Sequence, residues 1–202
     1  MKRIKVTLLF LSFSFVLNAQ NSERIFESIT NYKTFVEVKT NDGLYRFQPY
    51  GNEIIETSFI PAGETFNPNS HAVVLKTQPV EMEVVETSNL TEINMLDISV
   101  KISHSPFQVS YYYEGNLLTS EKRGYYKAVH EPMDLVKDNI IAKETERIEF
   151  NLTPDEVLYG GGARALGMNR RGYKLPLFNR AHYGYETHSE LMNFTLPIVY
   201  SS

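Results

Sequence analysis

The residues of this chain best suited to chemistry lie between positions 159 and 188. Three glycines, Gly160 to Gly162, precede an Asn-Arg-Arg-Gly turn at residues 169–172, and the pair Asn179 and Arg180 follows among aromatic side chains. Glycines this closely spaced are expected where the backbone must approach other groups more closely than a side chain allows. Asparagine and arginine can hold polar ligands through several hydrogen bonds. This block is therefore a candidate site.

One chemistry that the glycines suggest is dinucleotide binding. The spacing Gly160-x-Gly162-x-x-Ala165 fits the glycine fingerprint of such sites, and Glu186 lies about twenty residues beyond it. That fingerprint must open a helix inside a βαβ unit, whereas Gly167 and Gly172 follow at once and would break any helix. We interpret the match as coincidental.

A second candidate chemistry is metal binding by His182 and His188, with Glu186 between them. The alternative is a polar loop that lines a cleft or contacts a neighbouring domain. Neither a His-x-x-x-His pair on a helix nor any cysteine supports a metal, so we favour the polar loop and predict no metal site.

A third candidate is glycoside hydrolysis by paired carboxylates. Four glutamates fall on the exposed faces of expected strands, where charge is usually a solvated surface: Glu81, Glu83, Glu86 and Glu92. Asp155 and Glu156 follow Pro154 at what we expect to be the first positions of a turn or helix, where acidic side chains favour exposed N–H groups. The residues alone thus supply no complete catalytic set.

The elements that must position these residues have the two-residue period of β strands. Val36 and Val38 alternate with polar residues before an Asn-Asp-Gly turn at residues 41–43, which predicts a hairpin. Further strands are expected at residues 44–48, 53–60, 72–75, 80–86, 98–102, 107–113, 117–119 and 148–152. Short strands separated by Gly, Pro and Asn turns predict an all-β fold, a two-sheet β sandwich. The only helix candidate, between Glu131 and Lys143, is irregular, and residues 61–71 are expected to form a surface loop.

The N-terminus has the layout of a cleaved secretory signal peptide. Lys2, Arg3 and Lys5 precede an apolar run from Val6 to Leu17, and Ala19 supplies the small residue before the cut. The run is shorter than the roughly 20 residues that cross a bilayer, so we expect no stable membrane anchor. We predict a signal peptide at residues 1–19, one β-sandwich domain at residues 20–202, and a periplasmic or secreted protein.

The charge of the mature chain bears on its partners. Once residues 1–19 are removed, 17 basic and 24 acidic residues remain, a net charge of −7, and no Lys/Arg cluster interrupts this acidic balance. We therefore expect no nucleic-acid partner. The chain has no cysteine, so thiol catalysis, Cys-ligated zinc and disulfides are excluded, and its stability must come from its core.

The last fifty residues resemble the end of the N-terminal domain of glycoside hydrolase family 31, the α-glucosidase-like retaining enzymes. A Pro-x-Glu-x-x-Tyr-Gly segment of that family is similar to residues 154–162, and its Leu-x-x-Arg-Gly turn is similar to residues 167–172. An Asn-x-Asp segment with aromatics is similar to residues 178–183, and an apolar strand leading toward the barrel is similar to residues 196–199. Upstream, from residue 34, the resemblance is looser.

The resemblance implies a galactose-mutarotase-like sandwich that forms one wall of the substrate cleft of an exported α-glycosidase. The catalytic (β/α)8 barrel would begin beyond Ser202, so no catalytic residue is assigned to this chain, and the chain alone is expected to be inactive. The full enzyme would hydrolyse O-glycosyl bonds in an α-linked oligosaccharide without a metal or organic cofactor. The partners implied are this oligosaccharide and the chain's own barrel.

The resemblance also nominates four substrate-contacting residues, Asn179, Arg180, His182 and Tyr183; the alternative for the first two is that they pin the loop to the barrel. Ala181 stands where the family usually has Asp, so a carboxylate that would accept hydroxyl hydrogen bonds is missing. This favours an α-galactosidase, α-xylosidase or transglycosylase over a plain α-glucosidase.

A second hypothesis is a non-catalytic carbohydrate-binding module with a sugar held on tyrosines. The runs at residues 111–113 and 125–126 supply the rings, but successive strand residues point to opposite sides, so neither run should form a continuous platform.

Overall fold

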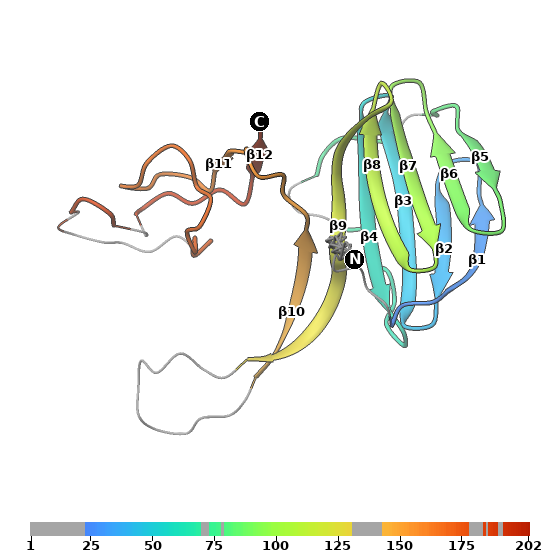
Figure 1. Ribbon diagram of the computed structural model, residues 1–202, viewed down its shortest axis with the longest axis horizontal. Coiled ribbons are helices and arrows are strands. Elements are labelled where there is room, and N and C mark those ends of the chain that lie inside the picture. The colour runs from blue at the N-terminus through green and yellow to red at the C-terminus, as the bar shows by residue number, and fades with distance from the viewer. Residues whose placement is uncertain are drawn as a thin grey trace, which may run out of the picture. The chain divides into compact units, whose positions relative to one another are not determined.

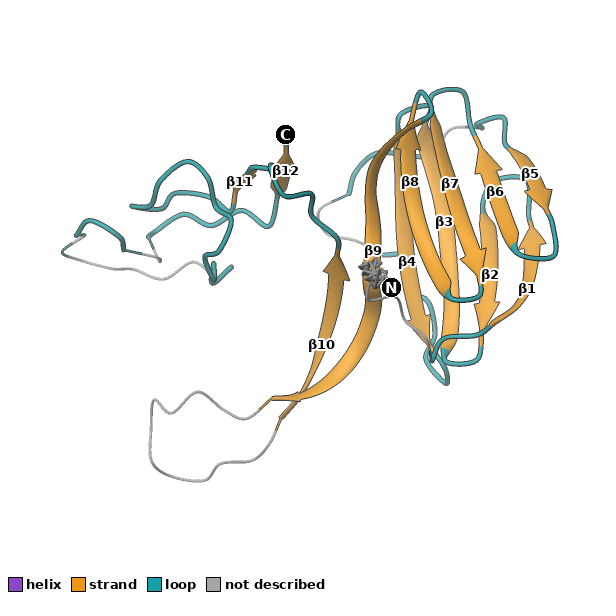
Figure 2. Cartoon of the chain, viewed as in Figure 1, coloured by secondary structure: helices purple, strands orange, loops and turns teal. Residues whose placement is uncertain are grey.

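The computed structural model describes residues 23–69, 73–77, 79–130, 143–177, 184, 186–189 and 192–202. These residues form two compact units, which divide between Asn151 and Leu152. Within this described part of the chain all regular secondary structure is β (Figure 2), and no helix there could span a membrane.

The first unit contains two antiparallel sheets (Figure 1). The four-stranded sheet has the order β1-β2-β3-β4 and the six-stranded sheet the order β10-β9-β8-β7-β6-β5. The strands of the first sheet are β1 (Phe26–Asn31), β2 (Val36–Thr40), β3 (Gly43–Gly51) and β4 (Ile54–Pro61). Those of the second are β5 (Glu83–Glu86), β6 (Leu90–Asn94), β7 (Ile98–His104), β8 (Phe107–Tyr113), β9 (Asn116–His130) and β10 (Lys143–Phe150).

The β2–β3 hairpin shows how local sequence sets the register. Thr40 pairs with Gly43, so Asn41 and Asp42 form a two-residue loop, as the Asn-Asp-Gly sequence predicts. Gly43 is required there, because a Cβ at this position would lie 2.5 Å from the carbonyl oxygen of Ile60 on β4. The register then places Val36 opposite Phe47 and Val38 opposite Tyr45.

The core lies between the two sheets, and strand alternation supplies it. Val36, Val38, Tyr45 and Phe47 come from the four-stranded sheet. From the six-stranded sheet come Ile93, Val100, Ile102, Phe107 and Val109. All nine side chains are buried, which confirms the face-to-face sandwich expected from the period-two pattern.

Strand β9 is the longest element, and its pairing with β10 is irregular. Glu149 pairs with Gly124, but the next residue, Phe150, pairs with Glu121. Two residues of β9 are therefore left over at this point, which is a bulge that redirects the neighbouring side chains. Figure 1 shows β9 bending as it leaves β8 and continuing alongside β10.

The second unit consists mostly of loops around a short two-stranded sheet of β11 (Leu158–Gly160) and β12 (Val199–Ser201). Tyr159 pairs with Tyr200 at the centre of this sheet. The two strands come from the two ends of the unit, so their pairing closes it on itself.

Most of the predicted strands are confirmed, with a few differences. Residues 73–75 were expected to be a strand but have none, and the strand expected at residues 80–86 covers only Glu83–Glu86. Residues 62–69 form the expected loop. The helix candidate falls on residues 131–142, which lie outside the described residues, and Lys143 belongs to β10. The signal peptide at residues 1–19 lies outside them as well.

Candidate functional site

The glycine block of the second unit is built by close backbone approach. Gly160, Gly161 and Gly162 all have positive φ angles, of 110°, 76° and 86°. A Cβ on Gly160 would lie 2.2 Å from the carbonyl oxygen of Ile198, and one on Gly162 would lie 2.6 Å from that of Phe194. The amides of Gly161 and Ala163 donate to those two oxygens at 2.9 Å. The glycines are thus structural, as predicted.

Two arginines of the Asn-Arg-Arg-Gly turn hold backbone carbonyls. Arg170 donates to the carbonyl oxygen of Gly160 at 3.2 Å and to that of Gly167 at 2.7 Å. The Nη1 atom of Arg171 lies 2.6 Å from the carbonyl oxygen of Thr153 and 2.9 Å from that of Glu156. Arg170 therefore fastens the turn to the glycine block, and Arg171 fastens it to the beginning of the unit.

The carboxylate of Glu156 also has a structural role. It accepts a 2.8 Å hydrogen bond from the backbone N–H of Thr153, so the residues form a reciprocal turn with the Thr-x-x-Glu spacing. The hydroxyl of Ser201 donates to the other carboxylate oxygen, and this bond lowers the pKa of Glu156 below its usual range. The turn role expected for the acidic residues after Pro154 is confirmed for Glu156.

The four predicted substrate contacts, Asn179, Arg180, His182 and Tyr183, lie outside the described residues, as does Ala181. The structure shows what holds the chain on either side of them. Before the segment, Arg164 donates a 2.6 Å hydrogen bond to the carbonyl oxygen of Pro176. After it, the backbone N–H of Ala165 donates to the carbonyl oxygen of Ser189 at 3.1 Å. The backbone N–H of His188 donates to the carbonyl oxygen of Ala165 at 2.8 Å. Residues 163–165 thus anchor both ends of the stretch that carries the predicted site.

Arg164 is a buried arginine, which is uncommon for a charged side chain. Its Nη1 atom donates to the carbonyl oxygen of Ala163 at 3.2 Å, while its Nε atom has no hydrogen-bond partner among the residues that the structure describes. Burial and the neighbouring charge of Arg170 lower the pKa of Arg164. A guanidinium held this way fixes the backbone at Ala163 and Pro176.

The other candidate chemistries gain no support from the described residues. Glu186 and His188 are exposed, and no group of three or more acidic or histidine side chains suited to a metal is found in the described ranges. No helix follows Gly162 there, as expected if the dinucleotide match is coincidental. Glu81, Glu83 and Glu86 are exposed, and Glu92 pairs with Lys101 at 2.7 Å.

The tyrosine runs point to alternate sides, as predicted. Tyr111 donates a 2.9 Å hydrogen bond to Thr57 of the opposite sheet, whereas the ring of Tyr112 lies under the ammonium group of Lys101. Tyr125 stacks on Phe59, and Tyr126 lies under the guanidinium of Arg123. Neither run forms a continuous aromatic platform.

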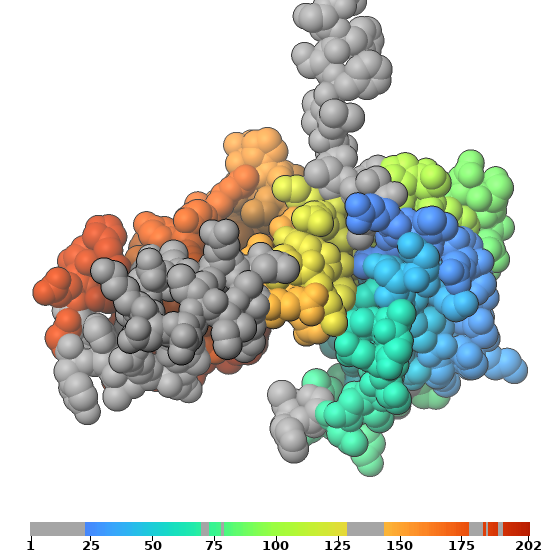
Figure 3. Space-filling model, turned by 90° about the horizontal axis from the view of Figure 1, so that it is seen from below, coloured from blue at the N-terminus to red at the C-terminus, as the bar shows by residue number. Residues whose placement is uncertain are grey.

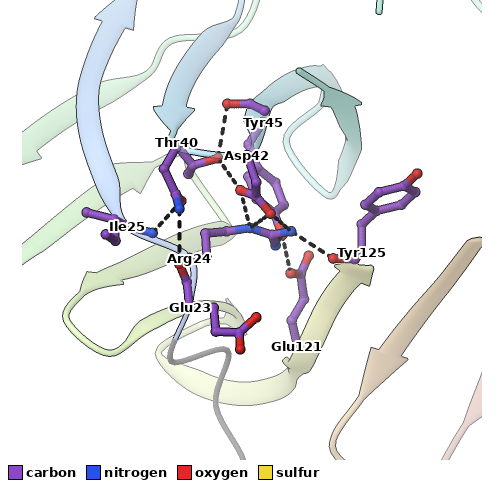
Figure 4. A network of polar contacts seen from close by, with 10 residues as sticks. Glu23, Arg24, Ile25, Thr40, Asp42, Tyr45, Glu121 and Tyr125 are labelled. Carbon is purple, nitrogen blue, oxygen red and sulfur yellow. Dashed lines mark hydrogen bonds and ion pairs between the residues drawn. The ribbon is translucent and has the colours of Figure 1, made fainter. Parts of the chain in front are cut away.

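The first unit contains a buried polar network that the sequence did not reveal (Figure 4). Arg24, 3% exposed, donates to Asp42 at 2.8 Å, to the carbonyl oxygen of Tyr125 at 2.7 Å and to the hydroxyl of Tyr45. Tyr45 in turn donates to Glu121, 7% exposed, at 2.7 Å. Residues of both sheets are thereby joined through one guanidinium, which also lies over the ring of Phe59 at 4.3 Å.

The electrostatics of this network are divided between two carboxylates. Burial raises the pKa of Glu121 to about 7, against the pull of Tyr45 and Arg24. For Asp42, burial acts upward, but the hydrogen bonds and charge of Arg24 together with the hydrogen bond from Thr40 outweigh it and lower the pKa. Arg24 is thus compensated chiefly by Asp42. Gly124 is a glycine inside a strand, which marks an irregularity at this place but does not indicate the residues of the network.

Comparison with known proteins gives one family and several solved structures. The family model described as glycosyl hydrolase 31 N-terminal galactose mutarotase-like domain matches residues 41–202. No curated protein matches the chain.

The fold is similar to parts of several family 31 enzymes. The similarity to a Flavobacterium johnsoniae dextranase complexed with isomaltotriose covers 88% of this chain and 21% of that enzyme, with 20% identity and a TM-score of 0.72. The similarity to a Xanthomonas citri α-xylosidase covers 85% of this chain and 18% of that enzyme, with 22% identity and a TM-score of 0.60. The similarity to a cycloalternan-forming enzyme of Listeria monocytogenes covers 90% of this chain and 16% of that enzyme, with 18% identity and a TM-score of 0.65. The chain therefore spans about a fifth of the length of these proteins or less.

Proposed function

Because this chain belongs to the family of glycosyl hydrolase 31 N-terminal galactose mutarotase-like domains, we propose that it is the N-terminal part of an exported, retaining α-glycosidase. The observation that carries the proposal is the family match, which covers residues 41–202 and includes the glycine block. The likeness of the fold to a dextranase and an α-xylosidase supports a substrate among α-linked oligosaccharides.

In the proposed reaction one carboxylate attacks the anomeric carbon and forms a covalent glycosyl-enzyme, while a second protonates the leaving oxygen. The second carboxylate then removes a proton from the water that releases the sugar, so the anomeric configuration is retained. Neither carboxylate is assigned to residues 1–202. Both belong to the barrel, and the chain on its own is inactive in this proposal.

This chain contributes a wall of the substrate cleft. The segment that begins at residue 178 carries four residues that donate hydrogen bonds to sugar hydroxyls or accept hydrogen bonds from them: Asn179, Arg180, His182 and Tyr183. The anchors at Pro176 and Ser189 support this role, because a contact segment must be held on both sides to position its side chains. Ala181 contributes no carboxylate, which favours a substrate other than a plain α-glucoside.

The test is to express the whole reading frame that encodes these residues, and separately residues 1–202. We expect the longer protein to hydrolyse isomaltotriose or an aryl α-xyloside, α-galactoside or α-glucoside. Proton NMR should show the α-anomer as the first product. The shorter chain should show no turnover. A longer protein that is inactive on all four substrates, or that releases the β-anomer first, would contradict the proposal.

The contact residues are tested in the longer protein. Loss of one charge-assisted hydrogen bond costs about 1.5–3 kcal/mol, so Arg180→Ala should lower kcat/KM roughly 10- to 150-fold. Lys174→Ala, an exposed cation of the same loop region, is the control and should leave kcat/KM unchanged. Equal kcat/KM values for the two variants would contradict a contact between Arg180 and the substrate.

Export is tested on the same protein. N-terminal sequencing of the mature chain from a native-like host should begin at Gln20 if residues 1–19 are a cleaved signal peptide. A mature protein that begins at Met1 and stays in the cytoplasm would contradict this part.

A further inference from the structure

We propose that the outer face of the four-stranded sheet carries a binding groove for neutral oligosaccharides, built by Arg46, Gln48, Glu56 and Phe66. The inference rests on the proposed function only for the choice of sugar probes. Nothing in it depends on a catalytic barrel.

The groove is formed where strand alternation meets a loop. Arg46 and Gln48 are the outward-facing residues of β3, since Tyr45 and Phe47 point into the core. Glu56 projects beside them from β4, where it pairs with Gln48. The chain after β4 then brings Phe66 and Asn67 beside these residues, which leaves an open groove of about 330 Å³. In Figure 3 the teal and green residues of this part of the chain lie next to the cyan and blue residues that precede them. Ligand pockets in proteins begin at roughly this size, about 300 Å³.

The polar side chains of the groove are held in place by their neighbours. Arg46 lies 3.3 Å above the ring of Phe35 and donates to Gln48 at 3.3 Å. Gln48 donates through its Nε2 atom to the carbonyl oxygen of Thr34 at 2.8 Å. Glu56 accepts a 3.2 Å hydrogen bond from Ser58. Side chains fixed in this way lose little conformational entropy when a ligand binds.

The charges of the groove select a neutral ligand. Arg46 and Glu56 are the charged side chains that line the groove, so the charges of its lining cancel, while Glu37, which pairs with Arg46 at 3.4 Å, is not part of the lining. An anion would face the carboxylate of Glu56, and a cation would face the guanidinium of Arg46. A neutral molecule with many hydroxyl groups can instead donate to Glu56 and accept from Arg46 in the same site.

The apolar part of the groove fits the other character of a sugar ring. Phe66 lies 4.9 Å from the guanidinium carbon of Arg46 and is half-buried, and Val73 and Leu75 line the same cavity. A pyranose ring has an apolar C–H face that packs against such side chains while its edge hydroxyls reach planar polar groups.

The test is titration of purified residues 1–202, labelled with ¹⁵N, with isomaltotriose and with xylose, and separately with inorganic phosphate. We expect one of the sugars to shift the amide signals of residues 46, 48, 56, 66 and 67, and phosphate to leave them unchanged. Phe66→Ala should weaken that binding roughly tenfold, as for other contact residues at the centre of a site. Tyr173→Ala, an exposed aromatic of the second unit, should not change it.

Glu56→Gln keeps the size of the side chain and removes its charge, so it serves as a second variant if Phe66→Ala fails to fold. It should weaken sugar binding severalfold while leaving the spectrum otherwise native. Absence of sugar binding, binding that shifts other residues, or binding of phosphate in preference would each overturn the proposal. Dimerisation that shifts these same signals without sugar would also overturn it. None of these outcomes bears on the activity of the longer protein, so the two proposals can fail separately.

Discussion

The carboxylate of Glu121 accepts a 2.7 Å hydrogen bond from the hydroxyl of Tyr45, and the two residues come from opposite sheets of the sandwich. Tyr45 lies on β3 of the four-stranded sheet, and Glu121 on β9 of the six-stranded one. Both are buried, and Arg24, the cation whose charge acts on Glu121, is held chiefly by Asp42. A carboxyl group in this position is easier to bury protonated than ionised, which makes the link between the sheets sensitive to pH.

Stability should therefore fall as pH rises from about 4.5 to above 7. The folded chain holds the Glu121 proton to a pKa of about 7, against an ordinary value of 4.5, so it binds more protons than the unfolded chain in this interval. The shift corresponds to about 3 kcal/mol of unfolding free energy, present in full below pH 4.5 and lost above pH 7. Urea unfolding at several pH values measures this slope.

Glu121→Gln provides the matched variant. Glutamine keeps an acceptor for Tyr45 but cannot ionise, so most of the slope between pH 5 and pH 8 should disappear. The loss of stability in stronger acid should remain, because there Asp42, whose folded pKa is lowered, takes up its proton. An unchanged slope in the variant would show that Glu121 does not titrate in this range.

Gly124→Ala should disrupt the same network. Gly124 has φ of 62°, and a Cβ would lie 2.2 Å from the Oε2 atom of Glu121 and 2.6 Å from the hydroxyl of Tyr45. The left-handed conformation costs about 1–2 kcal/mol for a residue with a side chain, and displacement of buried polar groups adds about 1–3 kcal/mol more. Denaturant unfolding should show the combined loss.

The control for Gly124 is Gly115, which turns the chain between β8 and β9. Its φ is 80°, and nothing lies within 4 Å of the position of a Cβ. Gly115→Ala should therefore cost only the conformational part. If both alanine variants lose the same stability, contact with the buried network is not what makes Gly124 necessary.

The sandwich was predictable from the sequence because its central strands obey a strict two-residue alternation. Val36 and Val38, or Ile98, Val100 and Ile102, have no other arrangement that buries them together. The Asn41-Asp42 loop was predictable for a similar reason, since its sequence permits a two-residue hairpin.

The network around Glu121 was not predictable, because it depends on a change of register. The bulge that pairs Gly124 and Glu121 with adjacent residues of β10 redirects Glu121 inward, and strand periodicity carries no such information. Arg24 reaches it from outside any strand and across a long sequence separation. Conversely, Val73 and Leu75 looked like a strand by composition, although they line an open groove.

In the second unit, Gly162→Ala should open the contact between the glycine block and residues 194–196. A Cβ would lie 2.6 Å from the carbonyl oxygen of Phe194 and 2.7 Å from the Cα atom of Thr195, so backbone must move away. The amide of Ala163 donates across this contact to Phe194, and that of Gly161 donates to Ile198 next to it, so both should then exchange with solvent at least about tenfold faster. Hydrogen exchange followed by NMR measures both.

Gly172 is the control for this position, because its φ of 85° is nearly the same and its Cβ position is open. Gly172→Ala should leave the exchange of the two amides close to that of the parent chain. Comparable acceleration in both variants would mean that strain at the glycines, and not the close approach of the backbones, governs the stability of the block.

Arg171 should be the arginine of this unit whose removal loosens the first turn most. Its Nη1 atom lies within 3.0 Å of three carbonyl oxygens, those of Thr153, Pro154 and Glu156, which no other described side chain contacts in this way. Arg171→Ala leaves these oxygens to water and should cost about 1 kcal/mol, since the site is partly exposed. Arg171→Lys should recover only part of this stability, because an ammonium group lacks the planar fork.

Limited digestion with chymotrypsin measures this difference, and it should cleave the alanine variant of Arg171 fastest and the lysine variant at an intermediate rate. Lys174→Ala, which removes a charge of the same sign nearby, should be cleaved like the parent chain. Cleavage of the Arg171 and Lys174 variants at one common rate would show that net charge, not the carbonyl contacts, sets the resistance of this unit.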